Sequence, residues 1–172
     1  MKSKILLILF ILGLGVSIGE AAHVYQTPKA FVADAFNGKP PKAKALWLTR
    51  KIAPTIQQIL HHAYIKKRVR YWPKDHRSVW VLQETGKEKL ITVGIVVDQA
   101  KIQQIKVLEF RESRGDEIRH AFFTDQFIGA KLEKKSRLDR HIDGISGATL
   151  SVSAMKKLAR MALYLDSVIH EK

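Results

Sequence analysis

The chain has 172 residues, a length typical of one domain, and 46% hydrophobic and 27% charged residues, an ordinary globular balance. It has no cysteine, which excludes disulfides, thiolate metal sites, cysteine nucleophiles and iron–sulfur clusters held by cysteine. Its formal net charge of +14 should attract anions, anionic lipid headgroups or an acidic protein.

The N-terminus has the organisation of a secretory signal peptide. A positive start, Met1 to Lys4, precedes an apolar run from Ile5 to Ile18, and Gly19-Glu20-Ala21 supplies small residues before a cleavage site after Ala21. The run is shorter than the roughly 20 residues that span a bilayer. We therefore predict that residues 1–21 are a signal peptide, with an uncleaved membrane anchor as the alternative. Nucleic acid is the default partner of a basic cytosolic chain, and export disfavours it here.

Residues 22–64 are predicted to be an N-terminal helical segment. Thr27-Pro28 is typical of an N-cap followed by proline at the first helical position, and apolar residues at helical spacing follow it. The stretch from Ala45 to Leu48 is a short apolar strand candidate. A second helix is indicated from Ile52 to Ala63 by the apolar positions 52, 56, 59, 60 and 63.

Residues 65–172 are predicted to be the principal domain, and strand patterns dominate its first half. Strands are indicated around Ile65 to Tyr71 and in three later runs: Val79–Leu82, Leu90–Val97 and Lys101–Phe110. The last two of these runs should form a hairpin. Short helices follow from Asp116 to Ile128. Inward-facing residues are expected there: Ile118, Phe122, Phe123 and Phe127.

The charged stretch from Lys131 to Arg140 is predicted to be a solvated loop or edge strand, and a long helix is predicted from about Leu150 to Ile169. The fold class is therefore α+β, an antiparallel sheet flanked by helices. Lys66, Arg68 and Arg70 would share one face of a strand, either as an ordinary solvated face or as a surface that steers an acidic partner.

The most informative stretch lies just before the last helix and reads Asp143-Gly144-Ile145-Ser146-Gly147-Ala148-Thr149. Its two glycines allow a sharp turn and a close approach to a ligand. A helix N-terminus presents unpaired N–H groups and the positive end of the helix dipole, which favour a phosphate or another anion. The alternative is a plain capped turn, with Ser or Thr as N-cap or with Asp143 accepting backbone N–H bonds.

This heptapeptide resembles the flavinylation motif of the FMN-binding domain family. That family includes the covalent-FMN C subunit of the sodium-translocating quinone reductase and the G subunit of Rnf complexes. A weaker resemblance extends over roughly residues 65–170, through Ile91–Phe110 and Phe122–Gly129. Where relatives often have a Glu-Thr-Pro-Gly-like turn, this chain has Glu112-Ser113-Arg114-Gly115, with arginine in place of proline.

The resemblance implies FMN joined by a phosphoester to Thr149, which would be a modification acceptor and not a catalytic nucleophile. The remaining cofactor-binding residues would be Asp143, Gly144, Ser146, Gly147 and Ala148. It also implies a flavin transferase that moves FMN from FAD, and electron exchange with a membrane or periplasmic redox partner. The expected location is the periplasm, free or tethered to the inner membrane.

Two rival functions are a noncovalent module for FMN or another phosphorylated ligand, and a basic membrane-surface adaptor. The chain contains no Ser-His-Asp order, paired carboxylates or P-loop that would indicate a self-contained hydrolase or transferase. His61-His62 has no carboxylate ligand nearby in the sequence. We therefore predict an electron carrier or redox subunit, with no catalytic residue and no metal site of its own.

Overall fold

The computed structural model describes residues 22–171, so the predicted signal peptide lies outside the described residues. Six antiparallel strands form the main sheet in the spatial order β1-β6-β5-β4-β3-β2. Their bounds are His23–Val24 (β1), Lys44–Trp47 (β2), Arg68–Lys74 (β3), Arg77–Thr85 (β4), Leu90–Asp98 (β5) and Lys101–Phe110 (β6). The predicted α+β class and the β5–β6 hairpin are confirmed.

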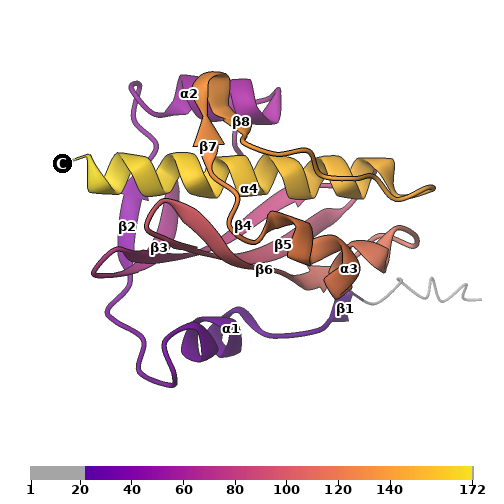
Figure 1. Cartoon of the computed structure of the whole chain (residues 1–172), viewed down its shortest axis with the longest axis horizontal. Coiled ribbons are helices and arrows are strands. Elements are labelled where there is room, and N and C mark those ends of the chain that lie inside the picture. Colours follow the sequence, from indigo (N-terminus) through magenta and orange to yellow (C-terminus); the bar gives the residue numbers. More distant parts are fainter. Residues whose placement is uncertain (1–21, 172) are drawn as a thin grey trace, which may run out of the picture.

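Helices cover both faces of this sheet, as Figure 1 shows. The long helix α4 (Thr149–His170) lies along one face, and α2 (Ala53–Leu60) packs on the outer side of α4. Helix α1 (Pro28–Ala35) lies on the opposite face. Strand β5 is almost entirely buried because it has a helix on each side, which explains its continuous apolar sequence.

The small helix α1 is fitted closely to the sheet. Thr27 caps it, since its hydroxyl accepts a hydrogen bond from the Ala30 N–H at 3.2 Å. Phe31 packs over Gly94 of β5, where an added Cβ would lie 2.5 Å from the phenyl ring. A glycine at this position is therefore required for α1 to approach the strand.

The segment between β6 and α4 is made of short elements. Their bounds are Asp116–Arg119 (η1), Ala121–Thr124 (α3), Asp125–Phe127 (η2), Leu132–Glu133 (β7), Lys134–Ser136 (η3) and Arg137–Leu138 (β8). Ile118, Phe123 and Phe127 are buried as predicted, but the inward prediction for Phe122 is wrong, because this side chain is 64% exposed. Adjacent residues of a helix point about 100° apart, so only one of the two neighbouring phenyl rings of α3 faces the core.

Residues 131–140 form a separate two-stranded hairpin, β7–β8, that packs against α4 and is not an edge of the main sheet. At the other end of the chain, residues 22–64 contain α1 and α2, and they also supply β1 and β2, the two edge strands of the sheet. No helix within residues 22–171 is both long and apolar enough to span a membrane.

Candidate functional site

The predicted motif forms the turn that leads into α4. Gly147 has a φ of +81°, a left-handed conformation that favours glycine, and the Ala148 N–H closes the turn on the Ile145 carbonyl at 3.0 Å. Ala148 is the N-cap and provides no side-chain hydrogen bond. Thr149 is the first helical residue, and its side chain is exposed. The N–H groups of this first turn therefore remain available to an external acceptor.

Three loops meet at this helix end and enclose a cleft of about 490 Å³. The motif contributes Gly147, Ala148 and Thr149, and the first turn of α4 contributes Leu150 and Ser151. The β4–β5 turn and the loop after β6 supply the other wall: Lys87, Glu112, Ser113 and Arg114. The predicted site residue Thr149 thus faces side chains that lie far from it in the sequence.

Glu112 ties the two loops of this wall together. One of its carboxylate oxygens, Oε1, accepts hydrogen bonds from the N–H groups of Lys87 (2.6 Å), Glu88 (2.8 Å) and Lys89 (2.9 Å). Burial alone would raise the pKa of this carboxyl, but the three N–H donors outweigh burial, and the pKa lies below its ordinary value. Glu112 is therefore an ionised structural anchor of the cleft.

Gly115 lets the same loop lie against α4. Its φ is +90°, and a Cβ added there would lie 2.8 Å from the Ser151 hydroxyl oxygen and 3.4 Å from the Ala148 Cβ. Both the backbone conformation and the close approach therefore require glycine. The Glu-x-x-Gly turn noted in the sequence is thus the element that shapes the wall opposite Thr149.

The charges at the cleft suit an anion. Lys87 and Arg114 are exposed at its rim; Lys87 pairs with the exposed Glu88 at 3.3 Å, and Arg114 forms no ion pair with any other described residue. Glu112, the acidic residue of the lining, is already bonded to three backbone N–H groups. A phosphate at Thr149 would find two cations and the positive end of α4.

The remaining predicted site residues lie outside this cleft. Asp143, Gly144 and Ser146 are exposed on the turn, and the cleft lining does not include them. The Asx-type cap predicted as one possibility for Asp143 is not formed, because its carboxylate accepts no backbone N–H bond from any described residue. Its own N–H donates to Gln126 Oε1 at 2.7 Å, and its carboxylate, 83% exposed, lies 3.5 Å from His141 Nε2. Such an accessible carboxylate is free to contact another protein.

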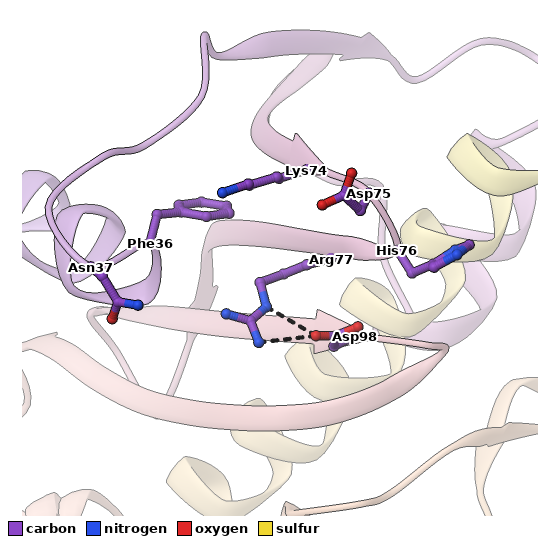
Figure 2. Close-up of a pocket in the computed structure, with 7 residues that line it drawn as sticks. All are labelled: Phe36, Asn37, Lys74, Asp75, His76, Arg77 and Asp98. Atoms are coloured by element: carbon purple, nitrogen blue, oxygen red, sulfur yellow. Dashed lines mark hydrogen bonds and ion pairs between the residues drawn. The ribbon is translucent and has the colours of Figure 1, made fainter.

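Other hollows lie elsewhere on the molecule. Figure 2 shows one of about 290 Å³ between the end of α1 and the β3–β4 turn, where Arg77 Nε donates to Asp98 Oδ2 at 3.0 Å. The adjacent Ser78 donates to Asp166 near the C-terminus of α4, so this hollow is at the opposite end of α4 from Thr149. Within residues 22–171 no three His, Asp or Glu side chains gather as metal ligands.

Comparison with protein families agrees with the geometry. Residues 86–164 match the model of the FMN-binding domain, a range that runs from the β4–β5 turn into α4 and includes the whole cleft. The chain therefore carries a domain of the FMN-binding domain family. It is an FMN-binding flavoprotein, as the motif before α4 led us to expect. No curated protein matches the chain.

Proposed function

We propose that the protein carries FMN covalently, through a phosphoester to Oγ1 of Thr149, and transfers electrons outside the cytoplasmic membrane. The observation that carries the proposal is the position of Thr149. It is the last residue of a complete flavinylation-like motif, the first residue of α4, and an exposed hydroxyl in a cleft of the FMN-binding domain. When bound, FMN supplies one- and two-electron redox chemistry.

The protein's own groups would hold the phosphate and shield the attachment point. The first N–H groups of α4 can donate to the phosphate oxygens, and Lys87 and Arg114 can neutralise their charge. Leu150 is 51% exposed at the same cleft and offers an apolar surface to a flavin ring. Glu112 keeps the loop that carries Arg114 joined to the turn that carries Lys87.

The attachment itself would need a separate flavin transferase. Among the described residues no carboxylate or imidazole is hydrogen-bonded to the Thr149 hydroxyl, so residues 22–171 provide no base that would activate it. In the transfer, the threonine oxygen bonds to the phosphorus of the FMN half of FAD. The bond between the two phosphates breaks, AMP leaves, and the hydroxyl proton is released. The exposed turn with Asp143 is a surface that the transferase could contact.

The proposed location and partners follow from the N-terminus and the charge. Residues 1–21 have the pattern of a signal peptide, which supports the periplasm, with tethering to the inner membrane as the alternative. A basic surface favours an acidic redox partner in the membrane or in the periplasm, since opposite charges accelerate association.

Co-expression with a flavin transferase in an exporting host, followed by intact-mass analysis, tests the covalent link. The mass should increase by one FMN less one water. Thr149→Ala should abolish the increase, and Thr149→Ser should retain part of it. Thr85→Ala is the matched control, since this exposed threonine lies outside both the motif and the cleft. Full modification of the Thr149→Ala variant would refute the assignment, and flavin released by denaturation would indicate noncovalent binding.

A further inference from the structure

A second cleft lies on the outer side of α4, and five of the ten residues that line it are Lys or Arg. It has a volume of about 310 Å³ and lies between the β7–β8 hairpin, the end of α2 and α4. It shares no lining residue with the cleft at Thr149, and no Asp or Glu of residues 22–171 lines it. Its cationic or titratable residues include His61, Arg137, Arg140, Lys156, Lys157 and Arg160.

Helical spacing and tertiary packing bring these groups together. Ser153, Lys156, Lys157 and Arg160 recur at intervals of three and four residues, which places them on one face of α4. Arg137 and Arg140 belong to a different element, the β7–β8 hairpin and the chain just after it, and they reach the same cleft from the other side. Positive charge therefore converges there from two directions.

Only part of this charge is balanced within residues 22–171. Arg140 pairs with Asp139 at 3.2 Å, and Lys157 lies 3.4 Å from the buried Glu84 carboxylate. Arg137 and Lys156 form no ion pair with any described residue. The cleft therefore holds more cations than its neighbouring carboxylates neutralise.

Arg160 is the least satisfied of these groups. Its Nη2 donates to the Ile59 carbonyl of α2 at 2.8 Å, but its Nε is buried and has no hydrogen-bond partner among the described residues. Burial lowers the pKa of this guanidinium, since the charged form loses hydration there. A half-buried cation beside other cations gains free energy when an anion approaches.

We propose that this cleft binds a multiply charged phosphate group, such as the diphosphate of a small ligand or a phosphorylated lipid headgroup. Guanidinium groups match phosphate oxygens with paired N–H donors, and the Ser153 hydroxyl adds a neutral donor beside them. The inference does not rest on flavin attachment, which involves the other cleft.

Calorimetric titration of the full chain with inorganic pyrophosphate, at constant ionic strength, tests the proposal. Arg137→Gln with Lys156→Gln removes two charges that pair with no described carboxylate, and the affinity should fall roughly tenfold or more. The matched control, Arg68→Gln with Arg70→Gln, removes the same charge from β3 and should change the affinity less than about twofold. Equal losses in both variants would mean that net charge alone attracts the anion.

A third variant separates this site from the flavin site. Lys87→Gln with Arg114→Gln alters only the cleft at Thr149, which also suits an anion. This variant should lose any pyrophosphate binding at Thr149 and keep unchanged the binding that depends on Arg137 and Lys156. Loss of all binding in that variant would place the anion at Thr149 and overturn the proposal. Absence of any binding heat for the unaltered chain would overturn it as well.

Two further ligands identify the source of the phosphate. Co-sedimentation with phosphatidylcholine vesicles that contain phosphatidic acid, weakened by the Arg137 and Lys156 changes, would identify a lipid headgroup. Pyrophosphate binding without that vesicle effect would identify a soluble ligand. A hexaglutamate peptide that binds more tightly than pyrophosphate, with the same sensitivity to the two changes, would show an acidic protein site and refute the phosphate assignment.

Discussion

Replacing Glu112 by glutamine should weaken the fold at neutral pH and have much less effect in acid. The native carboxylate oxygen accepts three backbone N–H bonds, at 2.6, 2.8 and 2.9 Å, and the residue is 9% exposed. Hydrogen bonds to a charged acceptor are worth roughly 1.5 kcal/mol each, and neutral ones about half as much. Three such differences amount to about 2 kcal/mol, and water at the exposed β4–β5 turn reduces the loss to about 1–2 kcal/mol.

The pH dependence has a definite sign. The pKa of Glu112 in the folded protein lies below its ordinary value near 4.5, because the three N–H donors outweigh burial. A carboxyl with a lowered folded pKa adds stability that is fully present above the unfolded pKa and is lost as pH falls through the folded pKa. The variant should therefore be less stable than the native protein above about pH 5, and the difference should shrink below pH 4.

Urea unfolding followed by tryptophan fluorescence measures this difference, since Trp80 is fully buried and stacked on Tyr71. The control is Glu88→Gln in the same turn. Its side chain is 69% exposed and forms an ion pair with the exposed Lys87. The same free-energy loss at pH 7 and at pH 3.5 would refute the anchoring role of the Glu112 charge. So would an equal, equally pH-dependent loss in the Glu88 variant.

Three other predictions concern the loop, the N-terminus and the basic strand. Gly115→Ala should lower the free energy of unfolding by about 1–3 kcal/mol, measured by thermal unfolding. Gly144→Ala should be nearly neutral, because nothing lies within 4 Å of a Cβ added there. Equal melting temperatures of the two variants would contradict the close approach of the Gly115 loop to α4. N-terminal sequencing of the exported protein should begin at Ala22, and an intact N-terminus in the membrane fraction would favour the anchor. When Lys66, Arg68 and Arg70 are each replaced by Glu, electron transfer to the partner, measured at low salt, should be slower while the flavin content stays unchanged. A rate that responds neither to salt nor to these replacements would show that the segment is an ordinary solvated strand.

The elements of this fold were predictable where the local sequence carries a period or a turn signal. The runs that became β4, β5 and β6 are rich in β-branched residues, and α4 shows the apolar spacing of a helix with one buried face. The motif before α4 was visible because seven adjacent residues carry it. The prediction for Phe122 was wrong because composition cannot tell which ring of a four-residue helix faces the core.

The sequence by itself determined the domain family, the candidate acceptor Thr149 and the helix that begins there, since all of these depend on adjacent residues. Only the tertiary structure decided what faces Thr149. Glu112 holds the β4–β5 turn beside the motif through bonds that span 23 to 25 residues, and strand pairing brings both loops to the N-terminus of α4. The same packing gathers the cations of the second cleft. Such convergence follows from register and burial, which no local pattern encodes.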